Sequence, residues 1–262
     1  MTYEDPWLRR FHPAPDAPVR LVCLPHAGGS ASFYFPMARA LAPAMDVLAV
    51  QYPGRQDRRH EPGVTRLTEL ADRIADALAP WTDRPLALFG HSMGGLLGYE
   101  IASRLEDAGH APVALFASAR RAPSRRRVES VHLRSDAGVI DELKLLDGTD
   151  SGLLLDDELL RMILPALRSD YEAIETYRHH PRPPLSTPIV ALTGDTDPQV
   201  TADEAQSWSA HSSGGFALHT FEGGHFYLTR HQAEVLDVIR RTVARESAAS
   251  VSAGPAYRAM GG

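Results

Sequence analysis

A serine flanked by two glycines, in the sequence GHSMG at residues 90–94, is the first candidate for chemistry in this chain. The G-x-S-x-G pattern places a nucleophilic serine on a tight strand-to-helix turn, where the side chains of larger neighbours would collide. The pattern alone is weakly specific. Its context is stronger, because residues 86–89 are typical of a buried strand and residues 95–106 of a helix. Ser92 is therefore the candidate nucleophile.

A serine hydroxyl becomes a good nucleophile only when a base takes its proton, and His225 is the candidate base. It lies in the sequence EGGHF at residues 222–226, directly after the last expected strand. A carboxylate must then hold the imidazole. Asp195 and Asp197, which follow another expected strand, are both suitable, and their spacing does not separate them. The chain order serine, aspartate, histidine is that of α/β-hydrolases.

Backbone N–H groups are the expected donors to the oxyanion that forms when such a serine attacks a carbonyl carbon. One is that of Met93, directly after the serine. The second is expected from the glycine-rich loop PHAGGS at residues 25–30, where Ala27 is the candidate donor. A phosphate-binding loop is the alternative, but the G-K-[ST] and G-x-G-x-x-G patterns are both missing from it.

Short apolar runs that alternate with helical patterns must position these residues. The expected strands are residues 19–24, 47–51, 86–89, 113–118, 189–193 and 216–221. The expected helices between and after them include residues 67–79, 95–106 and 233–245. This alternation predicts the α/β class, with a mostly parallel central sheet and flanking helices, in one domain over residues 1–245.

The segment 122–185 interrupts the alternation, because it shows helical patterns and no convincing strand. In its second helical pattern, which begins near an acidic start at 156–158, Pro165 is expected to kink or divide the helix. We expect an inserted helical lid here rather than an enlarged crossover. Its apolar face, which is expected to cover Ser92, includes Leu160, Ile163 and Leu167. The last segment, 246–262, is predicted to be a low-complexity tail and is assigned no function.

Composition excludes several classes of protein. The chain has 262 residues and a net charge of −6, which argues against general nucleic-acid binding. A single cysteine, Cys23, excludes a disulfide framework and a multi-cysteine metal site. We find no signal-peptide pattern and no apolar stretch long enough to span a bilayer, so a cytoplasmic protein without a membrane partner is expected.

Several of these stretches together resemble the type II thioesterases that accompany modular polyketide and nonribosomal peptide synthetases. The resemblance covers nearly the whole chain and is carried by PHAGG at 25–29, QYPGR at 51–55, GHSMGG at 90–95, PALRSDY at 165–171 and GGHF at 223–226. It implies the α/β-hydrolase fold and Asp197 as the acid. It also implies hydrolysis of misprimed or stalled acyl groups from the phosphopantetheine arm of acyl or peptidyl carrier proteins.

An arginine-rich segment could serve the carrier protein. The five arginines are either a solvated loop or a weak docking site for an acidic carrier and its phosphate. They are Arg120, Arg121, Arg125, Arg126 and Arg127. A monomer that needs no metal or cofactor is expected. The alternatives are a free-standing carboxylesterase or lipase, an acyltransferase, and a non-catalytic module that binds carrier proteins.

Overall fold

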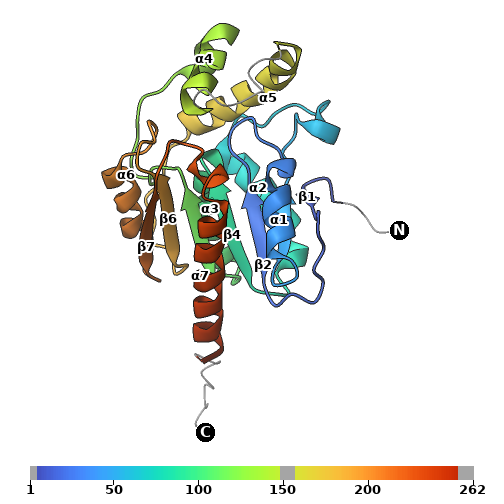
Figure 1. Ribbon diagram of the computed structural model, residues 1–262, viewed down its shortest axis with the longest axis vertical. Coiled ribbons are helices and arrows are strands. Elements are labelled where there is room, and N and C mark those ends of the chain that lie inside the picture. The colour runs from blue at the N-terminus through green and yellow to red at the C-terminus, as the bar shows by residue number, and fades with distance from the viewer. Residues whose placement is uncertain (1–4, 148–156, 253–262) are drawn as a thin grey trace.

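The computed structural model describes residues 5–147 and 157–252. Within them a central sheet has the strand order β1-β3-β2-β4-β5-β6-β7 (Figure 1). The strands are β1 Leu8–Arg9, β2 Arg20–Leu24, β3 Asp46–Val50, β4 Leu86–His91, β5 Ala114–Ser118, β6 Ile189–Gly194 and β7 Phe216–Phe221. Every pairing is parallel except that of β1 with β3. The predicted fold class is confirmed.

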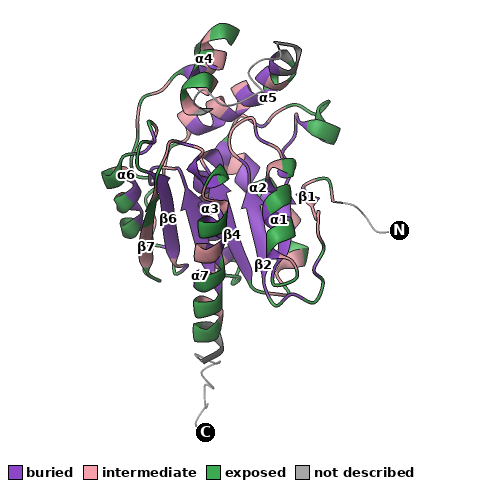
Figure 2. Ribbon diagram, viewed as in Figure 1, coloured by how far each residue is buried: buried purple, intermediate pink, exposed green. Residues whose placement is uncertain are grey.

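Helices cover both faces of this sheet. They are α1 Phe35–Leu41, α2 Leu67–Leu78, α3 Met93–Asp107, α6 Ala202–Gln206 and α7 Gln232–Ser252, with α4 Asp136–Asp147 and α5 Asp157–Thr176 between β5 and β6. Figure 1 shows α1 and α7 on one face, and α4 with α5 at the end of the molecule above the strands. Figure 2 shows the strands of the centre buried between these layers.

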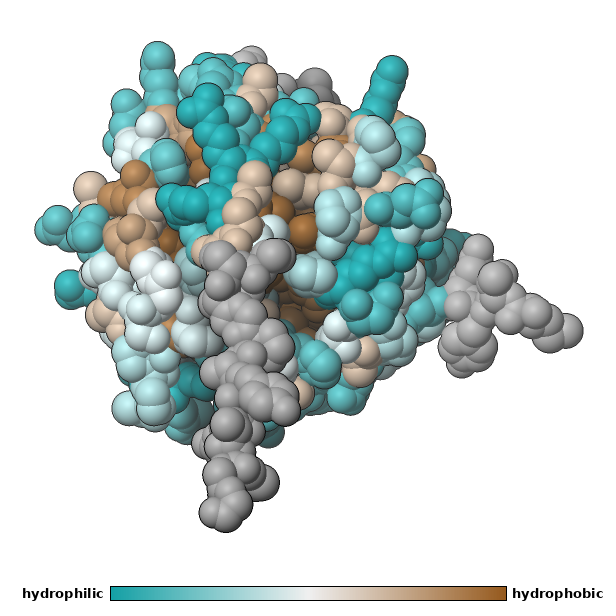
Figure 3. Space-filling view, turned by 90° about the horizontal axis from the view of Figure 1, so that it is seen from below, coloured by the Kyte–Doolittle hydropathy of each residue, from teal (hydrophilic) through white to brown (hydrophobic). Residues whose placement is uncertain are grey.

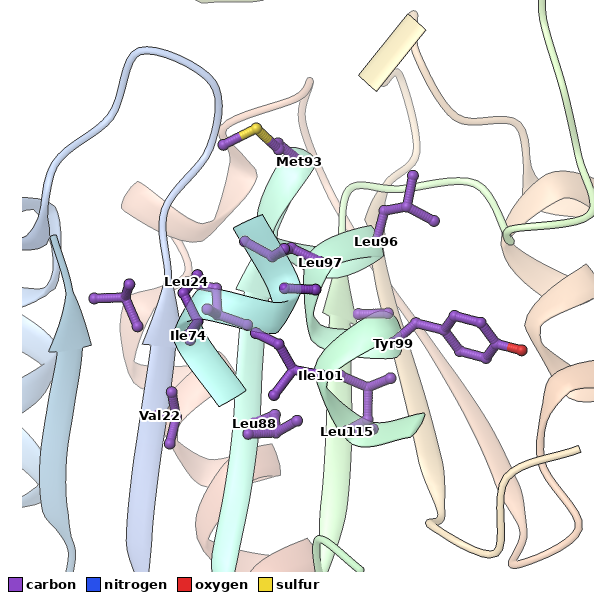
Figure 4. Close-up of a cluster of buried hydrophobic side chains, with 14 of the residues drawn as sticks. Val22, Leu24, Ile74, Leu88, Met93, Leu96, Leu97, Tyr99, Ile101 and Leu115 are labelled. Atoms are coloured by element: carbon purple, nitrogen blue, oxygen red, sulfur yellow. The ribbon is translucent and has the colours of Figure 1, made fainter. Parts of the chain in front are cut away.

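Alternating side chains of each strand supply two hydrophobic cores, because neighbouring residues of a strand point to opposite faces. In β2, Val22 and Leu24 join the core that packs against α2 and α3, part of which Figure 4 shows. Leu21 and Cys23 join the core beneath α1 and α7. Burial raises the pKa of the Cys23 thiol, so this cysteine packs as a small apolar residue.

Two expectations about the ends of the chain differ from the structure. The two-residue edge strand β1 was not predicted, because a segment this short carries no alternating pattern. The helix expected over 233–245 continues to Ser252, so residues 246–252 are helical, and residues 253–262 of the expected tail lie outside the described residues. Alanine and serine in this stretch are compatible with helix, and alanine favours it most strongly.

Pro165 was expected to kink or divide its helix, and division does not occur, because α5 runs through it from Asp157 to Thr176. Proline removes one backbone hydrogen bond from a helix interior. Leu164 and Leu167, on either side of Pro165, are buried in a small core with Val131 and Val139. This packing on both sides of the proline stabilises an undivided helix.

The end of the molecule opposite α4 and α5 has hydrophilic and hydrophobic side chains interspersed (Figure 3). None of the helices in 5–147 and 157–252 combines the length and apolar character that crossing a membrane requires.

Candidate active site

The turn that carries Ser92 lies between the end of β4 and the start of α3. Ser92 has φ 54° and ψ −115°, a conformation that non-glycine residues rarely adopt and that costs about 1–3 kcal/mol. A Cβ atom at Gly90 would lie 1.9 Å from the Gly94 carbonyl oxygen, and one at Gly94 would lie 2.0 Å from that of Leu24. The two glycines are therefore required by space, as the motif predicts. The Ser92 N–H donates to the Ser118 carbonyl at 2.8 Å and helps to hold the turn.

His225 follows β7 in a loop and is 2% exposed. Its Nδ1 lies 3.0 Å and 2.9 Å from the two carboxylate oxygens of Asp197, which comes from the loop after β6. Asp195 is exposed and accepts the Gly223 N–H at 2.8 Å, so it holds the loop of the histidine and does not contact the imidazole. The structure thus pairs His225 with Asp197 and gives Asp195 a different task.

A cavity of about 160 Å³ brings the sequence-predicted residues together beneath α5. Ser92 and His225 line it together with Ala27 from the loop after β2. Three side chains of α5, those of Leu160, Ile163 and Leu167, also line it. Met93 does not line the cavity, and its side chain is buried at the start of α3 (Figure 4). Its N–H is nevertheless one of the first four of a helix, which have no partner within that helix.

Two further histidines, which the sequence analysis did not single out, surround His225. The ring of His91 lies 5.2 Å from that of His225 and 5.9 Å from that of His26. Burial lowers the pKa of His26 to about 3 and that of His91 well below its usual range, and nearby His225 adds to both shifts. His91 Nδ1 is 2.9 Å from the Ser118 hydroxyl. Both rings are therefore neutral at ordinary pH; His91 packs against His225, and His26 packs against His91.

Charged side chains also line the cavity. Three of them are carboxylates with partners: Glu129 pairs with Arg121, Glu142 with Arg134 at 3.0 Å, and Glu175 accepts the Val131 N–H at 2.7 Å. Arg120 differs, since its buried Nε has no hydrogen-bond partner and burial lowers its pKa to about 9. At neutral pH Arg120 is thus a positive charge without an assigned partner within the described residues.

The arginines that the sequence analysis grouped do not form one exposed patch. All five line a second pocket, which shares Arg120 with the first. Arg121 is buried against Glu129, and Arg127 pairs with Glu204 at 2.6 Å. Arg125 and Arg126 are exposed. Only part of the cluster is therefore available to a partner.

The residues 51–55 and 165–171 carried the resemblance, but no role was predicted for them individually. Arg55 and Asp170 from these two stretches form a buried ion pair. Asp170 also accepts the Gly28 N–H at 2.7 Å, beside Ala27. The pair joins residues far apart in sequence, so spacing could not reveal it. In residues 5–147 and 157–252 no group of three or more histidine, cysteine, aspartate or glutamate side chains could hold a metal ion.

Comparison with known proteins identifies the family. A family model described as a thioesterase domain matches residues 19–243. A probable cadicidin biosynthesis thioesterase from Streptomyces griseus is 52% identical over 239 residues, which are 91% of this chain and 65% of that protein.

Two solved structures are similar along nearly the whole chain. The type II thioesterase BorB from the borrelidin biosynthetic cluster has a TM-score of 0.88 at 53% identity, with 93% of this chain and 100% of that chain covered. YbtT, a type II thioesterase from the yersiniabactin NRPS/PKS pathway, has a TM-score of 0.82 at 30% identity, with 92% and 99% covered. The chain therefore belongs to the thioesterase family, among the type II thioesterases of polyketide and nonribosomal peptide biosynthesis.

Proposed function

We propose that this thioesterase hydrolyses misprimed or stalled acyl groups from the phosphopantetheine thiol of acyl or peptidyl carrier proteins. One observation carries the proposal: Ser92 and His225 line the same cavity, and His225 is hydrogen-bonded to the buried Asp197. This constellation suits acyl transfer to a serine. The apolar side chains of α5 on the same cavity suit an acyl chain.

In the first half of the reaction, the Ser92 hydroxyl attacks the thioester carbonyl carbon while the imidazole of His225 takes its proton. Asp197 holds the protonated Nδ1 and stabilises the imidazolium. The carbonyl oxygen becomes an oxyanion, which accepts hydrogen bonds from the N–H groups of Ala27 and Met93. The C–S bond then breaks, and the leaving sulfur takes the proton from His225. A thiol leaves readily, because its pKa is about 8.5.

In the second half, His225 takes a proton from water, and the resulting hydroxide attacks the acyl-serine carbonyl carbon. The same backbone N–H groups hold the second oxyanion. The C–O bond to Ser92 breaks, His225 returns the proton to the serine oxygen, and the free acid leaves. The neutral state of His26 and His91 leaves His225 as the group among these three that exchanges the proton at neutral pH.

The carrier-bound arm is expected to approach along the arginine side. Arg120 lies where the Ser92 cavity meets the second pocket, and exposed Arg125 and Arg126 line that pocket farther along. Positive charge at an entrance attracts an acidic partner and raises the association rate. In a chain of net charge −6, this local field suits a carrier protein and its phosphate.

The test compares one acyl group on two leaving groups. Wild-type protein should hydrolyse the acyl-carrier thioester much faster than the ethyl ester of the same acid, and Ser92→Ala should abolish both activities. Ser209→Ala, at an exposed serine outside the cavity, is the matched control and should behave as wild type. Preference for the ester would favour a carboxylesterase. Full thioesterase activity of Ser92→Ala would overturn the proposal.

A further inference from the structure

A buried ion pair connects α5 to the loop that holds Ala27. The Arg55 guanidinium contacts the Asp170 carboxylate, and the two residues are 7% and 2% exposed. Asp170 lies on α5, and Arg55 lies in the segment after β3. Charges removed from water in this way need full hydrogen bonding, and removing one partner leaves the other uncompensated. Breaking this ion pair is therefore costly in free energy.

Two of the remaining hydrogen bonds of the pair reach the loop after β2, and a third stays within the segment of Arg55. Arg55 Nε donates to the Gly29 carbonyl oxygen at 2.7 Å, and its Nη1 donates to that of Pro53 at 2.7 Å. Asp170 Oδ2 accepts the Gly28 N–H at 2.7 Å. Burial raises the pKa of Asp170, while the Arg55 charge and the Gly28 N–H oppose that rise. Two successive residues after Ala27 are thus held by one ion pair.

Leu167, one turn before Asp170 on α5, contacts the same glycine. Gly28 has φ +74°, and a Cβ atom built on it would lie 2.9 Å from Leu167 Cδ1. A side chain at this position would be strained by its backbone and would collide with α5. Gly28 therefore lets α5 approach the backbone directly, with Leu167 packed against it and Asp170 bonded to its N–H.

We propose that Asp170 and Arg55 are positioning residues. They orient the Ala27 N–H toward the oxyanion, and because Asp170 lies on α5, the orientation of this N–H depends on where α5 packs. The inference rests on the proposed function, in which Ala27 is an oxyanion donor. Because α5 also lines the acyl cavity with Leu160, Ile163 and Leu167, one helix contacts the acyl chain and fixes the donor loop. An acyl group that fits badly beneath α5 then slows the chemical step as well as weakening binding.

The test uses two variants that alter the ion pair but keep a polar side chain of similar size at each position. In Asp170→Asn the amide oxygen can still accept the Gly28 N–H but no longer neutralises Arg55. In Arg55→Lys the charge remains, while the Nε donor to Gly29 is lost. We expect kcat for an acyl N-acetylcysteamine thioester to fall about tenfold to a hundredfold, since misplacement by about 1 Å can cost 10²-fold. KM should change little.

A second measurement separates positioning from mere folding. A trifluoromethyl ketone analogue adds to Ser92 and forms a tetrahedral oxyanion, so its affinity should fall in parallel with kcat/KM. The matched control is Arg20→Lys, at an arginine that is ion-paired and 6% exposed, close to the 7% of Arg55, but that lies at the start of β2. Arg20→Lys can lower the melting temperature, but it should leave the analogue affinity of the folded protein unchanged.

The outcomes separate this inference from the proposed function. Wild-type kcat and analogue affinity in both variants would overturn the inference. So would an activity loss that merely matches the unfolded fraction seen by circular dichroism. If Asp170→Asn folds and Arg55→Lys does not, the kcat and analogue affinity of Asp170→Asn alone decide whether the inference holds. If Ser92→Ala keeps its activity, the proposed function fails as well; if Ser92 is essential and the pair is dispensable, only the inference fails.

Discussion

Replacing Asp197 by asparagine should nearly abolish turnover, and the geometry shows why. Asp197 Oδ1 accepts the Gln199 N–H at 2.8 Å, so the amide oxygen of an asparagine would take this position. Its NH2 group would then occupy the position of Oδ2, which is 2.9 Å from His225 Nδ1. The amide oxygen at the Oδ1 position, 3.0 Å from Nδ1, already accepts the Gln199 N–H, and the facing NH2 group repels a protonated Nδ1. We therefore expect the proton to move from Nδ1 to Nε2. Nε2 could then no longer accept the proton of Ser92.

The expected loss is large because the carboxylate is fully buried and no water replaces it. In serine proteases the corresponding substitution lowers kcat by about 10⁴. At 1.36 kcal/mol per factor of ten, this is roughly 5 kcal/mol of transition-state stabilisation. Asp195→Asn is the matched control in the same loop. It is exposed, and its amide oxygen still accepts the Gly223 N–H, so a change within about twofold is expected.

The assay is kcat at saturating acyl N-acetylcysteamine thioester, with thermal unfolding recorded for each variant. The small thioester removes any effect of carrier binding. A loss below tenfold in folded Asp197→Asn would refute the tautomer argument. Equal losses in both variants would show that the loop, and not the carboxylate of Asp197, is what the reaction requires.

Three further predictions follow from the site. Because burial lowers the pKa of His26 to about 3 and that of His91 well below its usual range, neither ring should add to the acid limb of the profile of log(kcat/KM) against pH, so its slope above pH 5 should not exceed one, and a slope of two would contradict this. Arg125→Glu with Arg126→Glu should lower kcat/KM for acyl-carrier substrates, but not for the small thioester, and this difference should shrink in high salt. The control for net charge is Arg39→Glu with Arg241→Glu, at two exposed arginines on α1 and α7, and a parallel loss on both substrates would contradict docking. Ile163→Ala should lower kcat/KM for longer acyl chains by a factor that corresponds to about 1–3 kcal/mol of transition-state stabilisation, and it should leave kcat/KM for acetyl thioesters unchanged. An unchanged dependence of kcat/KM on chain length would exclude Ile163 from the acyl site.

Local patterns were sufficient to predict every strand of the sheet except β1, and the strand–turn–helix that carries Ser92. The residues close to Ser92 in sequence determine the strand, turn and helix, because Gly90 and Gly94 leave the space that the turn requires. A short stretch of sequence is therefore enough to predict this local structure. The same holds for the buried strands, whose apolar runs differ from observed bounds by one or two residues, as β2 and β4 show. Boundaries of this kind depend on hydrogen bonding at strand ends, which side-chain pattern does not record.

Roles that depend on distant contacts could not be predicted from spacing. Asp195 and Asp197 have the same chemistry, and they differ because one side chain turns toward Gly223 and the other toward His225. The carboxylate that neutralises Arg127 is that of Glu204, 77 residues away in the chain. Arg121 pairs with Glu129, which is only 8 residues away but is brought to it by the fold of the segment. The arginine cluster therefore looked more strongly charged in the sequence than it is in the folded protein.

The long connection between β5 and β6 has a consequence for how this protein can diversify. These strands pair in register although residues 119–188 lie between them. The entropy lost when a flexible chain is closed into a loop grows only with the logarithm of its length, so a doubling costs about 0.6 kcal/mol. Insertions and deletions at the exposed connections of this segment, outside the packed faces of α4 and α5, therefore cost the sheet little free energy. The segment that lines the Ser92 cavity can therefore change in length without loss of the sheet, provided that the hydrogen bond from the Gly28 N–H to Asp170 is kept.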